Sequence, residues 1–486
     1  MTNSLENLTN INWQQLAQSY RRKSQSYRLR EKREKYQFSK QKIPSFPPDL
    51  HLRKYQQQAV ANWLENKGRG TLKMATGSGK TIIALAIALE LYQQIGLKVL
   101  LIVCPYRHLV VQWQRECEKF NLHPMMAMNR VENWQGELAN NLYNLTTNSQ
   151  NFLTIITTNS TLISVGFQSQ LKYFPPKTLI VGDEAHNLGS TRLKSSLPRN
   201  IGLRLALTAT PERQYDEIGT EAMLNYFGGI IEPEFTLADA IEQGALVRYL
   251  YYPVFVELTA PEAVSYANLT KRIGWILNKN PSFENNETLT SLLTKRSRLI
   301  ASAANKLNCL KELMLSRLET SHTLFYCGDG YLNNYNVRQI DAVTRLLGQE
   351  LGYRVNTYTT QTSIEERESL RRQFELGELQ GLVAIRCLDE GIDIPAIKTA
   401  IILASSSNPR QFVQRRGRIL RPYPGKDQAT LFDTIVIPPN LERDIWEVEK
   451  NLLRKELLRF MTFAQLADNS QFAIQQLLQL QARYDL

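Results

Sequence analysis

The sequence has few of the features that mark a membrane, secreted or metal-binding protein. No uninterrupted apolar run in its 486 residues is long enough to cross a bilayer, and the polar N-terminus lacks the apolar core of a signal peptide. The five cysteines and five histidines are scattered without paired metal-ligand spacing, which favours reduced, mostly buried thiols. We therefore expect a cytoplasmic protein that contacts no membrane.

Low-complexity tracts and internal repeats are also missing, and a hydrophobic content of 43% is that of an ordinary globular protein. The chain is too long for a single core, so we expect two or three domains. Acidic residues are outnumbered, which gives a formal net charge of +12. This excess indicates either a polyanionic partner such as nucleic acid or merely a soluble basic surface.

Residues 1–48 read as a basic N-terminal extension. Tyrosines alternate with lysines and arginines between Tyr20 and Tyr36, and Pro44, Pro47 and Pro48 prevent a helix from continuing into the next segment. Such a segment either follows a phosphate backbone or forms a solvated helix face.

Apolar β-type runs alternate with helical patterns over residues 49–227 and again over 308–438. This rhythm predicts an α/β fold of two units, each a parallel sheet with helices on both faces. The strands expected in the first unit are Thr71–Met74, Val99–Val103, Phe152–Ile156, Leu179–Gly182 and Leu203–Thr208. Those expected in the second are Thr323–Cys327, Tyr353–Thr357, Leu382–Ile385, Thr399–Ala404 and Leu431–Ile437. Two successive units imply a cleft between them, where ligands commonly bind.

The remaining segments look mainly helical. Residues 228–307 read as a connecting segment with a β insertion at Leu250–Glu257. Residues 439–486 read as a C-terminal tail whose apolar positions recur at helical spacing, so we expect an amphipathic helix that packs back on the second unit.

A phosphate-binding loop follows the first strand, in the segment Met74-Ala-Thr-Gly-Ser-Gly-Lys-Thr81. Gly77 and Gly79 let backbone N–H groups turn toward phosphate oxygens, and the following helix contributes its N-terminal dipole. Lys80 is expected to reach the β/γ-phosphates, and the Thr81 hydroxyl to ligate Mg²⁺. The nucleotide-binding set is Ala75, Thr76, Gly77, Ser78, Gly79, Lys80 and Thr81.

A second acidic element follows a later strand, in Asp183-Glu-Ala-His186. A carboxylate at the tip of a neighbouring parallel strand is suited to hold Mg²⁺, which assigns Asp183 as a second metal residue. Glu184 can orient the attacking water, and His186 can sense the state of the site. The phosphate loop and the acidic element together predict ATP hydrolysis with Mg²⁺.

Further short motifs occur in a fixed order along the chain. They are Arg53-Lys-Tyr-Gln-Gln-Gln-Ala59, Ile102-Val-Cys-Pro-Tyr-Arg107, Ile156-Thr-Thr158, Thr208-Ala-Thr210, Phe325-Tyr-Cys-Gly328, Cys387-Leu-Asp-Glu-Gly-Ile-Asp-Ile-Pro395 and Gln414-Arg-Arg-Gly-Arg-Ile-Leu-Arg421. Together with the two elements above, this order resembles the DEAD/DEAH-box helicases of superfamily 2 over about Leu52 to Pro424. The resemblance implies two tandem RecA-like domains and an ATP-hydrolysing enzyme.

The resemblance also assigns roles to individual residues. Further nucleotide contacts fall to Gln56, Gly391 and Asp393. Nucleic-acid contacts fall to Pro105, Arg107, Thr157, Thr158, Gly328 and Arg386. The residues expected to couple the nucleotide site to the nucleic acid are Thr208, Ala209, Thr210 and Gln414. Arg418 and Arg421 correspond to arginine fingers, whose planar guanidinium groups match phosphate and raise turnover by roughly 10³–10⁵.

Two departures from the RNA-remodelling pattern favour DNA over RNA as the partner. The acidic element ends in His186, and the last motif begins with Gln414. Both features look closer to type III restriction subunits and excision-repair helicases. Phosphate contacts themselves do not distinguish the two sugars, so an RNA helicase remains the alternative.

No carboxylate–lysine cluster suggests a built-in nuclease. A role in bacterial restriction, DNA defence or repair would therefore require a separate nuclease or modification subunit. A different class of function, a non-catalytic clamp or scaffold with the same fold, also remains open. It is disfavoured because the lysine, the acids and the arginines of the motifs are all present.

Overall fold

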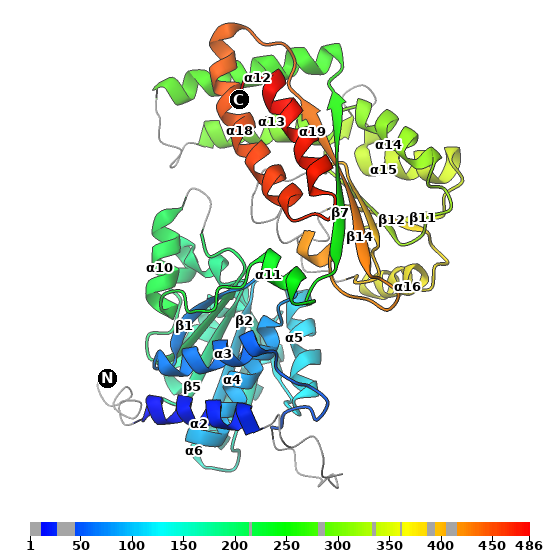
Figure 1. Ribbon diagram of the computed structural model, residues 1–486. Coiled ribbons are helices and arrows are strands. Elements are labelled where there is room, and N and C mark those ends of the chain that lie inside the picture. Colours follow the sequence, from blue (N-terminus) through cyan, green and yellow to red (C-terminus); the bar gives the residue numbers. More distant parts are fainter. Residues whose placement is uncertain are drawn as a thin grey trace. The chain divides into compact units, whose positions relative to one another are not determined.

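A computed structural model describes residues 11–26, 44–212, 216–279, 287–332, 337–359, 362–385, 394–404 and 416–486. The chain divides into two compact units, Met1–Thr236 and Leu237–Leu486 (Figure 1). Among the described helices, none combines the length and the apolar character that a bilayer span requires. The two parallel α/β units expected from the sequence are confirmed.

The first unit is built on a six-stranded parallel sheet in the order β1-β6-β5-β2-β4-β3. Its strands are β1 (Arg69–Lys73), β2 (Val99–Cys104), β3 (Met125–Ala127), β4 (Leu153–Thr158), β5 (Thr178–Asp183) and β6 (Leu203–Thr208). Its helices are α2 (Trp13–Ser26), α3 (Lys54–Glu65), α4 (Lys80–Ile95), α5 (Arg107–Lys119), α6 (Gln135–Thr146), α7 (Asn159–Leu162), α8 (Val165–Gln170), α9 (Thr191–Lys194) and α10 (Glu217–Phe227). The expected strands appear within a few residues of their predicted bounds, whereas β3 is too short to give a periodic signal.

Both faces of this sheet are buried, as the continuous apolar runs predict. On one face, side chains such as Leu101 and Ile180 pack with Leu138 of α6, Phe167 of α8 and Phe227 of α10. Alternate residues of β2 face the opposite way and are equally inaccessible to solvent. Helices α3, α4 and α5 cover that side (Figure 1). The sheet therefore forms a rigid base for the loops at its carboxyl edge.

The part of the N-terminal extension that the structure describes contains a helix that belongs to the first unit. Helix α2 packs on α3 and buries Leu16, Ala17 and Tyr20. Arg21 also forms an ion pair with Glu65, with 2.6 Å between nitrogen and oxygen. Leu16 and Tyr20 of α2 therefore contribute to packing. The basic residues from 27 to 43 lie outside the described part of the chain.

The second unit contains another six-stranded parallel sheet, in the order β11-β12-β8-β13-β14-β7. Its strands are β7 (Arg248–Glu257), β8 (Thr323–Cys327), β11 (Val355–Tyr358), β12 (Gly381–Ile385), β13 (Thr399–Ile402) and β14 (Gln428–Ile437), beside a small hairpin of β9 (Tyr331–Leu332) and β10 (Val337–Arg338). Its helices are α11 (Leu237–Glu242), α12 (Ala260–Lys279), α13 (Glu287–Ala301), α14 (Asn305–Leu315), α15 (Gln339–Arg345), α16 (Ile364–Glu375), α18 (Arg443–Gln465) and α19 (Ser470–Arg483).

The segment expected to connect the domains contributes to this second unit. Strand β7, expected as a β insertion, pairs in parallel with β14 along its whole length (Figure 1). Helices α12 and α13 pack with α18, where Glu449 is fully buried and accepts from Arg296 Nη2 at 2.8 Å and from Tyr266 at 2.6 Å. The predicted return of the C-terminal helix onto the second unit is confirmed by these contacts.

Lys306 of α14 is almost fully buried beneath this sheet, where its ammonium donates to the carbonyl of Leu403. Burial lowers the pKa of Lys306 to about 8, although the nearby Asp433 carboxylate opposes the shift. The charged ammonium is therefore costly in the folded state.

We expect the free energy of unfolding of the wild-type protein to rise with pH because of Lys306, and we expect Lys306→Met to abolish this rise. A lysine in the unfolded chain keeps its proton up to about pH 10.4, so the unfolded state binds more protons between pH 8 and that value. Wild-type stability should rise relative to the variant across this window, by up to about 3 kcal/mol, and the difference should be constant below it. Urea denaturation of both proteins at several pH values measures this. Lys311→Met, on the exposed side of α14, is the control, and a pH-independent difference for Lys306→Met would contradict the assignment.

Candidate functional site

The phosphate loop lies between β1 and α4, where the sequence predicted it. Gly77 and Gly79 adopt left-handed backbone angles, with φ of 85° and 79°, which glycine tolerates without steric cost. A side chain at Gly79 would also collide with Gln56, because its Cβ would lie 2.4 Å from Nε2. Lys80 opens α4, and its ammonium donates to the carbonyls of Met74 at 2.9 Å and Ala75 at 3.2 Å.

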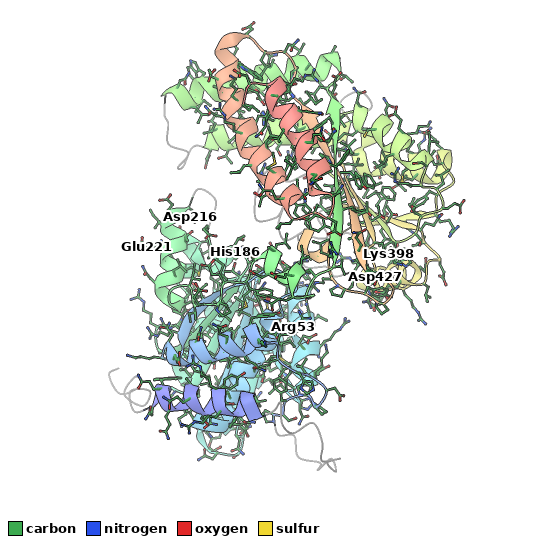
Figure 2. The ribbon with its side chains drawn as sticks, viewed as in Figure 1. Arg53, His186, Asp216, Glu221, Lys398 and Asp427 are labelled. Carbon is green, nitrogen blue, oxygen red and sulfur yellow. The ribbon has the colours of Figure 1, made fainter. Side chains whose placement is uncertain are left out.

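Helix α3 holds this loop from one side. Gln56 Nε2 and the Tyr55 hydroxyl both donate to the carbonyl of Ser78, at 3.0 Å and 2.7 Å. The Oε1 of Gln56 accepts from the backbone N–H of Arg53, the residue labelled at the start of α3 in Figure 2. Burial raises the pKa of Tyr55, which keeps the phenol protonated as a donor. Gln56 thus supports the phosphate loop, and its contact with a base stays a prediction.

Phe235 completes the support of the loop. Its ring stacks on Tyr55 with centroids 3.9 Å apart, and its carbonyl accepts from the backbone N–H of Ala75 at 2.7 Å. A chain segment far from the loop in sequence therefore holds both the loop backbone and the helix that supports it.

The acidic element follows β5 at the carboxyl edge of the same sheet. Asp183 accepts from the indole Nε1 of Trp113 at 2.8 Å and from the backbone N–H of Glu184 at 3.0 Å. Glu184 adopts a left-handed conformation with φ of 45°, which is uncommon for a residue other than glycine. The turn directs the carboxylate of Asp183 toward Trp113 and that of Glu184 toward His186.

His186 joins the acidic element to the end of β6. Its Nδ1 lies 3.2 Å from Oγ1 of Thr208 and 3.6 Å from a carboxylate oxygen of Glu184. The same threonine hydroxyl accepts from the backbone N–H of Thr210 at 3.2 Å. Figure 2 shows His186, which is buried, at the end of the first sheet. The predicted coupling residues Thr208 and Thr210, with Ala209 between them, therefore lie beside the acids.

Strand β6 also contacts the phosphate loop directly. It lies between β1 and β5 in the sheet, and the carbonyl of Thr208 accepts from the backbone N–H of Met74 at 2.9 Å. One threonine thus bonds to the loop through its backbone and to the acidic element through its side chain. The residues predicted for nucleotide, metal and coupling roles in the first unit form one cluster.

The residues present fit a magnesium–nucleotide complex. Thr81 lies in the first turn of α4, and Asp183 lies at the tip of β5, so the site offers one hydroxyl and one carboxylate. Within the described residues, no group of three His, Cys, Asp or Glu side chains gathers to hold a metal. A sparse donor set of this kind suits Mg²⁺, which usually keeps several waters and shares substrate phosphates.

Cys104 lies at the end of β2, beside the acidic element. Burial raises the pKa of its thiol well above the usual range, and the nearby Asp183 carboxylate adds to the shift. The thiol therefore stays protonated at neutral pH and acts as a small packing residue, as the sequence suggested for the cysteines.

The predicted nucleic-acid residues of the first unit divide into two kinds. Arg107, two residues after Pro105, is exposed in the first turn of α5 and is available to a ligand. Thr157 and Thr158 are buried instead. The hydroxyl of Thr157 donates to the carbonyl of Ala127 at 2.8 Å, and that of Thr158 caps α7. Both threonine side chains serve the fold, so their predicted contact would have to come from the backbone.

In the second unit, Gly328 follows β8 and its N–H donates to Oε1 of Gln339 at 2.7 Å. A Cβ there would lie 3.1 Å from that of Ala301, so close packing explains the glycine. The predicted residues Arg386, Gly391, Asp393 and Gln414 lie outside the described part of the chain.

The last motif is held by buried charges. Residues 416–419 are helical, and Arg416 forms a fully buried ion pair with Asp433 of β14, which also accepts from the Tyr251 hydroxyl at 3.1 Å. The predicted finger Arg418 is largely buried, and Arg421 is partly exposed. Arg416 is therefore a structural anchor of this motif.

Lys426 forms a second anchor that the sequence analysis missed. Its buried ammonium donates to the carbonyls of Pro395 at 3.0 Å, Ile419 at 2.6 Å and Arg421 at 2.9 Å. One cation thus joins the residue that ends the fifth motif to the sixth motif. A lone lysine after a Pro-Gly turn carries no signal of this role.

Comparisons with known proteins agree with this geometry. The family model described as type III restriction enzyme, res subunit, matches residues 49–213, and the helicase conserved C-terminal domain matches residues 305–423. The chain is 28% identical over 411 residues to the DNA 3'-5' translocase XPB2 of Sulfurisphaera tokodaii, which covers 81% of this chain and 83% of the relative. It is 24% identical to putative helicase 22 of Sulfolobus islandicus filamentous virus over 80% of this chain, but spans only 64% of that protein.

Among solved structures, the chain is similar to the ATP-dependent type ISP restriction-modification enzyme LlaBIII bound to DNA. The TM-score is 0.55 with 19% identity, over 85% of this chain and 30% of that one. At this identity the likeness concerns the fold, and it agrees with the two parallel α/β units.

We expect Lys426→Met to loosen the sixth motif. The substitution removes three hydrogen bonds that a buried ammonium donates to backbone carbonyls, which should lower the free energy of unfolding by about 3 kcal/mol or more. Amide hydrogen exchange of residues 416–421 should accelerate, whereas exchange in the first unit should not change. Lys271→Met is the matched control, because that lysine is exposed and reaches Glu442 only at 3.8 Å. Equal exchange in the two variants would rule out the anchoring role.

Proposed function

Because this chain belongs to the superfamily 2 helicases, we propose that it is a DNA-dependent ATPase that translocates on DNA or unwinds it. The observation that best supports the proposal is the cluster at the carboxyl edge of the first sheet. There Thr208 bonds both to the phosphate loop and to the His186 of the acidic element. A change at the nucleotide can therefore reach the coupling segment through one residue.

Each residue of the cluster has a role in hydrolysis of ATP. Lys80 binds the β/γ-phosphates, and the N–H groups of the loop hold their oxygens. Thr81 and Asp183 would hold Mg²⁺, which supplies charge neutralisation at the phosphates when it is bound. Glu184 orients the attacking water, and the left-handed turn separates its carboxylate from that of Asp183.

The second unit contributes Arg418 and Arg421 in this proposal. Their guanidinium groups would neutralise charge on the transferring phosphate, and the buried Arg416 and Lys426 hold the segment that carries them. Because fingers from a second domain act only when the domains close, hydrolysis would be linked to domain movement.

DNA is favoured over RNA as the partner. The relative with 28% identity is named a DNA 3'-5' translocase, and the net charge of +12 suits a polyanion. RNA helicase activity is the alternative. A place in a restriction, defence or repair system, with a separate nuclease or modification subunit, is a finer proposal supported by the res-subunit match.

A non-catalytic clamp is the alternative from a different class. It would keep the fold and the nucleic-acid surface without turnover. The geometry of Lys80, Asp183 and Glu184 disfavours it, because a clamp does not require two acids to be held beside a phosphate loop.

We expect single-stranded or double-stranded DNA to stimulate ATP hydrolysis by the wild-type protein. Lys80→Ala and Glu184→Gln should each reduce turnover by about 10²-fold or more, because one removes the phosphate contact and the other the water-orienting group. A phosphate-release assay with DNA and RNA measures this. Stimulation by RNA alone would exclude the DNA preference, and unchanged turnover in both variants would exclude the assigned roles.

Binding to DNA should weaken steeply with salt. Each phosphate contact releases counterions, so the logarithm of the binding constant should fall linearly with the logarithm of salt concentration. Fluorescence anisotropy with a labelled oligonucleotide measures the slope. Arg107→Ala should lower the slope by about one unit if this exposed arginine contacts a phosphate, with Arg272→Ala on the exposed side of α12 as a comparison. Identical slopes in all three proteins would remove Arg107 from the contact surface.

A further inference from the structure

Trp113 lies in α5, the helix that follows the motif Ile102–Arg107, and its side chain contacts Asp183. It lies in the middle of α5 and is 2% exposed, and its indole N–H donates to Oδ2 of Asp183 at 2.8 Å. A hydrogen bond to a charged acceptor is stronger than one between neutral groups. The bond therefore fixes the orientation of the carboxylate assigned to magnesium.

The start of the same helix is exposed. Helix α5 begins at Arg107, directly after Tyr106, which is 44% exposed. Trp113 lies six positions after Arg107, which corresponds to about 9 Å along a helix. The helix packs against β4 and α4, so its turns move together. A ligand at the first turn and the carboxylate at Asp183 are thus joined by a short rigid element.

The position of α5 in the chain explains why this connection exists. Strand β2, which precedes α5, pairs with β5 from Val99 to Val103, and β5 ends at Asp183. Both strands therefore present their carboxyl ends at the same edge, and α5 leaves that edge beside the acid. The indole ring reaches the carboxylate without crossing the sheet.

We propose that Trp113 is a positioning residue for Asp183, and that it connects nucleic acid bound at the start of α5 to the magnesium side of the ATP site. This inference rests on the proposed function. A shift of α5 on binding DNA changes the indole–carboxylate bond, and through it the orientation of the Asp183 oxygens. The residue touches neither ATP nor DNA and acts through the carboxylate.

The test is Trp113→Phe, which keeps an aromatic ring and removes the N–H donor. The Mg²⁺ concentration for half-maximal ATP hydrolysis should rise by about tenfold, since a bond to a charged acceptor is lost. Stimulation by DNA should fall toward the basal rate, whereas binding of a fluorescent ATP analogue without Mg²⁺ should not change.

Trp63→Phe is the matched control. Trp63 is also fully buried in the first unit, and its indole N–H donates to a backbone carbonyl, that of Arg204, at 3.2 Å. This variant loses the same atoms and the same kind of donor but does not touch Asp183. Equal Mg²⁺ dependence and equal DNA stimulation in the two variants would overturn the proposal.

A second measurement needs no activity and no substitution of Trp113. The chain holds six tryptophans, so selective ¹⁵N labelling gives six indole resonances, which single substitutions of the other five assign by elimination. The Trp113 indole resonance should shift on adding Mg²⁺ with an ATP analogue, and again on adding DNA. A resonance unmoved by both would exclude the connection even if Trp113→Phe failed to fold.

The outcomes also separate this inference from the function on which it rests. If wild-type protein shows no DNA-stimulated hydrolysis, the proposed function fails whatever the variants do. If the wild type is stimulated and Trp113→Phe behaves as Trp63→Phe does, only the role of Trp113 fails.

Discussion

Strand β6 provides the contacts on which the candidate site depends. Its position between β1 and β5 brings the carbonyl of Thr208 to the phosphate loop and its hydroxyl to His186. In a parallel sheet all carboxyl ends lie at one edge, so three separate motifs meet there. With a different strand order the phosphate loop and the acidic element would still be present in the sequence, but no single residue would bond to both of them.

Several side chains around this edge hold functional groups without acting on a ligand themselves. Tyr55 and Gln56 hold the loop backbone, and Trp113 holds Asp183. In the second unit, Arg416 and Lys426 hold the arginine motif by buried charged hydrogen bonds. Breaking such bonds costs more than forming them gains, because a buried group is left unsatisfied. These supporting residues therefore restrict the groups to one arrangement.

Much of the site could be predicted because its signals are local. A glycine-rich turn before a helix, or two acids after an apolar strand, can be read within about ten residues. The supporting contacts could not be predicted in this way. Lys426 donates to the backbone carbonyls of Pro395 and Arg421. Every residue carries a backbone carbonyl, so the residue types in the sequence do not reveal which carbonyls accept from the lysine. The buried hydroxyls of Thr157 and Thr158 show the converse, since a motif match does not reveal exposure.

The sequence alone determined the two parallel α/β units, the phosphate loop and the acidic element, because hydrophobic period and short motifs act over neighbouring residues. Tertiary structure alone decided that β7 pairs with β14, that α2 packs on the first unit, and that Trp113 meets Asp183. These contacts join positions far apart in the chain. They follow from strand order and packing, which no local pattern encodes.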